Sequence, residues 1–264
     1  MRTVALIGYG AMASFVANHL RRSPWQISYC VIRKGRQKEA RFAIGEEPTL
    51  VCGVDEFDTL PDLVVDCAGH LGLRAHGAAV LRKGIPLVSA SLGALADTQT
   101  HRMLDEAAQE GQTQLQLASG AIGALDALSA ASVGGLEHVR YTGVKPPESW
   151  HGTPAEEILD LGSLVEPVTH FNGSARDAAL RYPKNANVAA AVAMAGLGFD
   201  QTQTRLIADP KAPGNTHTIS AKGAFGTFEF TITGNSLPDT PRTSALAAMS
   251  VVDRILRNNA SIII

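Results

Sequence analysis

A glycine-rich hexapeptide, GYGAMA at residues 8–13, constrains the fold of this chain more than any other feature of its sequence. It follows a short apolar run, residues 4–7, and precedes a segment of helical periodicity, so it lies between a buried strand and a helix. Gly8 permits a tight turn, Gly10 keeps no side chain in front of the backbone, and Ala13 lets the helix pack closely on the sheet. The turn is therefore predicted to bind the pyrophosphate of a dinucleotide at a helix N-terminus. The residues predicted to contact it are Gly8, Gly10, Ala11 and Met12.

Residues 1–118 alternate between strand-like and helix-like segments. The predicted strands are residues 4–7, 27–32, 63–67 and 86–89, and the predicted helices are residues 11–22, 73–83 and 101–110. Alternation of this kind implies a parallel sheet whose connections are right-handed crossovers through helices. The N-terminal part is therefore predicted to be a Rossmann-type α/β domain.

From about residue 119 the pattern changes. Apolar and polar residues alternate over 139–143 and 228–232, which predicts antiparallel strands with one buried face. Helices are expected at residues 153–161 and 186–195. This second region is predicted to be an α+β domain with a mainly antiparallel sheet.

The C-terminal segment, residues 243–258, carries an apolar stripe at helical spacing. A lone amphipathic helix must bury that stripe, so we expect it to pack back on the first domain. The predicted division is a Rossmann domain of residues 1–118 plus 240–264 and a substrate and dimerisation domain of residues 119–239. No Pro/Gly/Ser-rich linker separates the two, which predicts close packing with a cleft between them.

The composition excludes several functional classes. The chain has 264 residues and a net charge of −2, which argues against a nucleic-acid partner. Its three cysteines, Cys30, Cys52 and Cys67, form no CxxC pair and fit a reducing cytoplasm. We see no targeting segment, and the longest weakly polar stretch, residues 188–199, is too short to cross a membrane. No histidine pair has metal-ligand spacing, so no metal is expected.

The residue expected to bind the cofactor's ribose departs from the usual pattern. An acidic residue commonly follows the second strand, about 20 residues beyond the glycine turn, and binds the ribose hydroxyls. Here that place is held by Arg33, in the sequence VIRKGR. An arginine can accommodate a 2′-phosphate, and the alternative is a solvated basic loop. The prediction is therefore NAD or NADP, with the preference open.

Two segments of small residues are candidates for the nicotinamide end of the cofactor. The sequence DCAGH ends a predicted strand, where open α/β sheets bind ligands, and Ala68 and Gly69 leave room for a ribose. His70 in this segment is interpreted as a loop histidine. The sequence SGAIG at residues 119–123 permits close backbone approach, or serves only as the turn between the domains.

Polar residues of the second region are candidates for the substrate. Arg181 and Lys184 could hold a carboxylate, although either could be a surface cation. Asn187 could cap the following helix or offer its amide to a ligand. By spacing alone, His217 is interpreted as a histidine at a strand end.

Several longer blocks, taken together, resemble the L-aspartate dehydrogenase family. They are GYGAM, SGAIGALDAL, KPP followed by TPAEEI, FNGSARDAALRYPKNANVAA and DPKAPGNTHTI. The resemblance implies a Rossmann domain plus an α+β domain in a homodimer. It also implies that Ala121 and Asn187 contact the cofactor and that His217 is the active-site histidine. Members of the family oxidise L-aspartate with NAD or NADP to iminoaspartate, which yields oxaloacetate and ammonia.

This chemistry is consistent with the residue types. Hydride leaves the α-carbon for the nicotinamide, and a histidine titrates near neutrality, so His217 could accept a proton or activate the water that attacks the imine. Iminoaspartate could feed pyridine nucleotide biosynthesis. The alternatives are another small two-domain dehydrogenase or reductase, of the homoserine dehydrogenase or dihydrodipicolinate reductase kind, and a dinucleotide-sensing protein without turnover.

Overall fold

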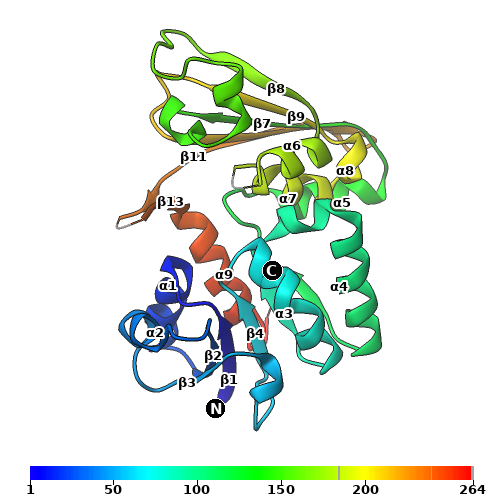
Figure 1. Ribbon diagram of the computed structural model, residues 1–264. Helices are drawn as coiled ribbons and strands as arrows, with labels where there is room; N and C mark the ends of the chain where they lie inside the picture. Colours follow the sequence, from blue (N-terminus) through cyan, green and yellow to red (C-terminus); the bar gives the residue numbers. More distant parts are fainter. Residues whose placement is uncertain (184, 239, 263–264) are drawn as a thin grey trace.

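The computed structural model describes residues 1–183, 185–238 and 240–262 and contains two separate main sheets (Figure 1). The first is a six-stranded parallel sheet in the order β3-β2-β1-β4-β5-β6. Its strands are β1 (Arg2–Ile7), β2 (Trp25–Val31), β3 (Thr49–Val51), β4 (Leu63–Asp66), β5 (Leu87–Ser89) and β6 (Leu115–Leu117). β1 pairs with β2 on one side and with β4 on the other, so the strand order reverses there. Ligands of open α/β sheets bind at such a reversal, beyond the carboxyl ends of the strands.

Helices connect the strands of the first sheet, which confirms the predicted Rossmann-type architecture. They are α1 (Ala11–Leu20), α2 (Gln37–Ile44), α3 (His70–Arg82) and α4 (Thr98–Glu110), with 3₁₀ turns η1 (Val54–Glu56) and η2 (Leu92–Ala96). Residues 4–7 of β1 and all of β4 are buried, and they are apolar except for Asp66, as expected of strands that are covered on both faces. Both strands end at the glycine turn and the CAG segment, so the fold brings these two segments together.

The second sheet has five strands in the order β11-β10-β7-β9-β8. They are β7 (Leu136–Lys145), β8 (Val168–Ser174), β9 (Gln203–Ala208), β10 (Asn215–Gly223) and β11 (Gly226–Gly234). Only the β7–β9 pair among them is parallel, so the sheet is mainly antiparallel as expected. The helices α5 (Leu125–Val133), α6 (Ala175–Arg181), α7 (Asn187–Ala195) and α8 (Gly198–Gln201) lie between this sheet and the first domain (Figure 1). Alternate residues of β7, such as Val139 and Tyr141, are fully buried.

The C-terminal helix, α9 (Ala245–Arg257), returns to the first domain and lies beside α1 (Figure 1). A short hairpin of β12 (Ser236–Leu237) and β13 (Thr240–Ser244) precedes it. Val251 and Ile255 belong to the same apolar cluster as the core of α1, which explains why the helix packs there. Gly120 donates its N–H to Ser250 Oγ at 3.1 Å, so α9 also holds the segment between the domains. The boundaries at residues 118/119 and 239/240 stay a prediction.

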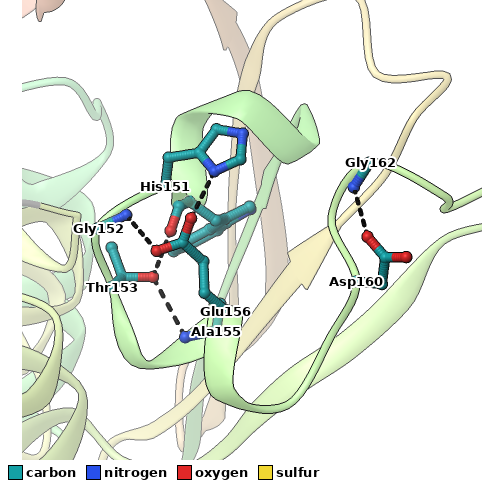
Figure 2. Close-up of polar contacts among 8 residues, drawn as sticks. His151, Gly152, Thr153, Ala155, Glu156, Asp160 and Gly162 are labelled. Carbon is teal, nitrogen blue, oxygen red and sulfur yellow. Dashed lines mark hydrogen bonds and ion pairs between the residues drawn. The ribbon is translucent and has the colours of Figure 1, made fainter.

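The predicted helix at residues 153–161 is wrong. The segment forms only the 3₁₀ turn η4 (Pro154–Glu157), shortly after another, η3 (Pro147–Trp150). Its local hydrogen bonds explain the difference. The Glu156 carboxylate contacts His151 Nδ1 at 2.6 Å and accepts the Gly152 N–H at 2.8 Å, so the chain folds into a compact loop (Figure 2). In the part of the chain that the structure describes, no helix is long and apolar enough to cross a membrane.

Candidate functional site

The turn between β1 and α1 has the geometry that its glycines predict. Gly8 has φ of +92°, and a Cβ there would lie 3.0 Å from the Cβ of Ala68. Gly10 instead has φ of −75° and ψ of −169°, which any residue can adopt, and a Cβ there would meet nothing within 4 Å. Gly8 is therefore required by the fold, whereas Gly10 leaves open space in front of the N-terminus of α1, where a phosphate can approach.

A cleft of about 290 Å³ lies beside this turn, between the two domains. The residues predicted for the site that line it are Met12, Gly69, Ala121, Asn187 and His217. Gly8 and Ala68 lie against each other at the turn itself. A larger groove of about 900 Å³ lies near β6 and α4, but none of the predicted residues lines it. The smaller cleft is therefore the candidate active site.

His217 lies on β10 and is 4% exposed. Its Nδ1 is 2.8 Å from the hydroxyl oxygen of Tyr141, which lies on the neighbouring strand β7. Burial, together with the positive charge of Lys145, lowers the pKa of His217 to about 3. The imidazole is therefore neutral at physiological pH.

Lys145 ends β7 and also lines the cleft, although it is only 8% exposed. Its Nζ donates a long hydrogen bond of 3.4 Å to the Asn185 carbonyl and lies 5.3 Å from the centre of the Trp150 ring. No carboxylate of the described residues pairs with it. Burial lowers the pKa of Lys145 to about 8. A buried cation without an anionic partner is unfavourable, so this position favours an anionic ligand.

The loop after β7 supports Lys145 from behind. Trp150, whose ring lies against the ammonium group, is fully buried. Thr153 donates its hydroxyl to the Trp150 carbonyl at 2.6 Å, and the contact between Glu156 and His151 closes the same loop (Figure 2). Asn185 Nδ2 donates to the Ser149 carbonyl at 2.8 Å, which ties the loop to the segment before α7.

Asn187 joins the two domains through its side-chain amide. Oδ1 accepts the Gly93 N–H at 2.7 Å, and Nδ2 donates to the Ala90 carbonyl at 2.6 Å. His70 Nε2 lies 3.0 Å from the same Oδ1, so Nε2 carries the proton in this contact. His70 is also the first residue of α3, so its interpretation as a loop histidine is wrong. Through Asn187 it takes part in the contact between the domains.

The buried carboxyl group of Asp66 lines the cleft and connects the segments that border it. Asp66 ends β4, is 2% exposed, and accepts hydrogen bonds from Ser89 Oγ at 2.8 Å and Ser91 Oγ at 2.7 Å. The Ala68 N–H donates to its other oxygen at 3.0 Å. Burial raises the pKa of Asp66. These bonds connect β4 with the segment after β5 and fix the small residues that border the cleft.

Two predicted residues, Arg33 and Arg181, do not line the cleft, and a third is not described. Arg33 is exposed in the loop after β2, with no side-chain partner among the described residues. Arg181 is exposed at the end of α6, with its guanidinium 5.7 Å from the centre of the Phe171 ring, and it does not line the cleft. Lys184 lies outside the described residues. Among the residues that are described, no group of three or more His, Cys, Asp or Glu side chains could hold a metal ion.

The structure also brings in residues that sequence reasoning did not select. Lys145 and Tyr141 belong to a strand whose alternation was recognised, but alternation gives only the buried face. A tyrosine or a lysine does not by itself indicate a functional site, and the residues that Tyr141 and Lys145 contact, His217 and Asn185, are distant in sequence. Two signals pointed to Lys145. It begins the KPP block of the family resemblance, and it is a charged residue at a position of the buried face, where lysines are rare without a functional or ionic partner.

Sequence comparisons identify relatives of both parts of the chain. The pattern described as "Aspartate dehydrogenase, C-terminal" matches residues 126–258, and that described as "Homoserine dehydrogenase, NAD binding domain" matches residues 8–118. The chain is 51% identical to the L-aspartate dehydrogenase of Ruegeria pomeroyi, over 98% of this chain and 93% of that protein. It is 45% identical to the L-aspartate dehydrogenase of Pseudomonas aeruginosa, over 98% of both chains.

Solved structures show the same architecture. The aspartate dehydrogenase of Thermotoga maritima superposes with a TM-score of 0.76 at 24% identity, covering 100% of this chain and 99% of that one. A hyperthermophilic archaeal homoserine dehydrogenase in complex with NADPH gives a TM-score of 0.63 at 12% identity, covering 99% and 98%. At these identities the structures support the fold, while the sequence relatives decide the family. The chain belongs to the L-aspartate dehydrogenase family.

Proposed function

We propose that this protein is an NAD(P)-dependent dehydrogenase that oxidises L-aspartate to iminoaspartate, which is hydrolysed to oxaloacetate and ammonia in a reversible reaction. Membership of the family supports the reaction. The observation that carries it is that His217 and the buried cation Lys145 line the same cleft beside the glycine turn, and that no carboxylate of the described residues pairs with Lys145. A dicarboxylate substrate supplies the anion that this cation lacks.

The turn and the cleft fit a nicotinamide dinucleotide. The open space at Gly10 leaves the first N–H groups of α1 free for the pyrophosphate. Gly69 and Ala121 border the cleft without large side chains, so they leave room for the nicotinamide ribose. The bound dinucleotide supplies the hydride acceptor. Arg33 can reach a 2′-phosphate from its exposed loop, which supports use of NADP as well as NAD.

In the cleft, Lys145 supplies the cation that was expected of Arg181, which does not line the cleft, while Lys184 stays a prediction. Its ammonium group is charged below a pH of about 8 and can hold a substrate carboxylate through a charge-assisted hydrogen bond. His217 and Lys145 both line the cleft, and the charge of Lys145 contributes to the lowered pKa of His217. We expect both side chains to contact the same small substrate.

Homodimerisation, a cytoplasmic location and a place in pyridine nucleotide biosynthesis are further parts of this proposal. The family resemblance supports the first and third, and three cysteines without a CxxC pair support the second. The division into residues 1–118 plus 240–264 and residues 119–239 is also proposed, and the return of α9 to α1 supports it.

Steady-state kinetics with L-aspartate, L-homoserine and L-glutamate, each with NAD and with NADP, test the proposal. We expect reduced cofactor to form with L-aspartate, and to be consumed with oxaloacetate plus ammonia. Turnover of homoserine in place of aspartate would favour the related dehydrogenases. Tight cofactor binding without turnover of any amino acid would favour a dinucleotide sensor.

A further inference from the structure

The hydroxyl group of Tyr141 has a single hydrogen-bond partner among the described residues. It lies 2.8 Å from His217 Nδ1, and the tyrosine side chain is fully buried. No carbonyl or carboxylate oxygen of the described chain accepts its proton. The position of the protons in this pair can therefore be worked out by counting donors and acceptors.

Two arrangements are possible for the neutral imidazole. If Nδ1 carried the proton and donated to Tyr141, the buried tyrosine O–H would have no acceptor, at a cost of about 1–3 kcal/mol. If the O–H donates to Nδ1, that donor is satisfied and the ring proton lies on Nε2. Nε2 has no hydrogen-bond partner among the described residues and is not fully buried, and His217 lines the cleft, so ligand or water can accept its proton there. The second arrangement is favoured.

The sheet is built to permit this contact. Gly143 lies directly opposite His217 in the pairing of β7 and β10. A Cβ at Gly143 would lie 2.6 Å from the Tyr141 hydroxyl oxygen. The backbone at this position does not need glycine for a left-handed conformation. The missing side chain leaves the space through which the tyrosine reaches the histidine.

We propose that Tyr141 is a positioning residue whose hydroxyl holds neutral His217 in the Nε2–H tautomer, so that His217 acts on substrate as a hydrogen-bond donor. This replaces the expectation that His217 accepts a proton, because the nitrogen that faces the cleft already carries one. The adjacent positive charge of Lys145 opposes a second proton on the ring. The donor serves an oxygen of the substrate, either of a carboxylate or, in the reverse direction, of the C2 carbonyl of oxaloacetate. The assignment of a substrate oxygen as the acceptor rests on the proposed function, whereas the assignment of the tautomer does not.

Nuclear magnetic resonance of protein labelled with ¹⁵N-histidine tests the tautomer without any substrate. His217→Gln identifies the signals of residue 217 by their loss. We expect the protonated nitrogen to be Nε2 in the unmodified protein, and the Nδ1–H form to appear in Tyr141→Phe. Tyr182→Phe is the matched control, since it removes a buried hydroxyl 3.3 Å from a different histidine, His170. A proton on Nδ1 of His217 in the unmodified protein would overturn the proposal.

A pair of substitutions at residue 217 tests the donor role independently of whether Tyr141→Phe folds. Glutamine places an N–H group near the position of histidine Nε2 but cannot exchange protons at neutral pH, whereas alanine supplies neither function. Loss of one such donor costs about 10²–10³ in kcat. We expect His217→Ala to show that loss and His217→Gln to retain at least about tenfold more activity than His217→Ala. Equal loss in both variants would contradict the proposal. An unmodified protein with the Nε2–H form but no aspartate turnover would sink only the proposed function.

Discussion

The two walls of the cleft differ in the size and polarity of the residues that form them. The wall from the first domain carries mainly small residues, among them Gly69 and Ala90, and the glycine turn at residues 8–13 lies beside it. The opposite wall, called the side-chain wall below, includes the large buried side chains of His217 and Lys145. The first wall offers N–H groups and space, which suit a cofactor shared by many enzymes. The second offers charge and a fixed imidazole, which suit one substrate.

The largest expected effect is on the side-chain wall. His217→Ala should lower kcat for L-aspartate by about 10²–10³, because it removes the proposed hydrogen-bond donor to the substrate. The Kd of NADH should change little, since the turn at Gly8 and Gly10 is untouched. Steady-state kinetics and fluorescence titration with NADH measure the two quantities. Near-normal kcat in this variant would remove His217 from the mechanism.

Substitution of the buried cation should affect substrate binding more than cofactor binding. Lys145→Met removes a charge-assisted hydrogen bond worth about 1.5–3 kcal/mol, so the Kd of the dicarboxylate succinate should rise about 10- to 100-fold. Succinate binding to the unmodified protein should weaken as the pH rises through about 8, because Lys145 loses its proton there. Calorimetric titration measures both effects.

Lys222→Met is the control for that experiment, since Lys222 is an exposed lysine of the same sheet, paired with Glu137 at 2.5 Å. It should bind succinate normally at every pH. If Lys145→Met also binds succinate normally, another residue holds the carboxylate.

The side-chain wall should also make stability depend on pH. The folded-state pKa of His217, about 3, lies below the ordinary value of 6.5, so the unfolded chain binds the proton more readily. The contribution of neutral His217 to the free energy of unfolding is complete above pH 6.5. It is lost as the pH falls toward 3, at up to about 1.4 kcal/mol per pH unit. Urea unfolding at pH 7 and pH 5 should show a smaller difference in His217→Gln than in the unmodified protein. Equal differences would mean that His217 titrates normally.

The smallest effect is expected at the exposed end of the cofactor site. Arg33→Ala removes a cation from the exposed loop after β2, and an exposed ion pair with the 2′-phosphate is worth up to about 1 kcal/mol. The Kd of NADPH should therefore rise up to about fivefold while that of NADH stays constant. Arg102→Ala, an exposed arginine on α4, is the control. An equal change for both cofactors would show that Arg33 does not bind the 2′-phosphate.

The contrast between the walls explains what could be predicted from the sequence. The turn at residues 8–13 is contiguous, and its chemistry depends on backbone conformation, so the local pattern was sufficient. The parallel sheet followed from alternation of strands and helices. The helix expected at residues 153–161 failed because side-chain contacts such as that of Glu156 with His151 outweigh local propensity.

The side-chain wall depends on pairing between distant strands. Tyr141 and His217 are 76 residues apart and meet only because β7 pairs with β10 in one register. Alternation places Lys145 on the buried face but does not say what lies opposite it. The resemblance to a family supplied His217, and only the fold supplied its neighbours. Arg181 shows the converse, since it is a cation in one of the blocks of the family resemblance but does not line the cleft, and its guanidinium lies over the Phe171 ring.

A titration of two variants with NADH and succinate tests most directly whether the glycine turn binds the cofactor and the side-chain wall binds the substrate. Gly10→Val places a side chain in the open space before α1 without backbone strain, and Lys145→Met removes the cation. We expect Gly10→Val to weaken NADH binding by about 10- to 100-fold, the scale of one lost charge-assisted hydrogen bond. We expect Lys145→Met to bind NADH normally and to lose succinate. Normal NADH binding by Gly10→Val, or equal loss of NADH in both variants, would contradict the account.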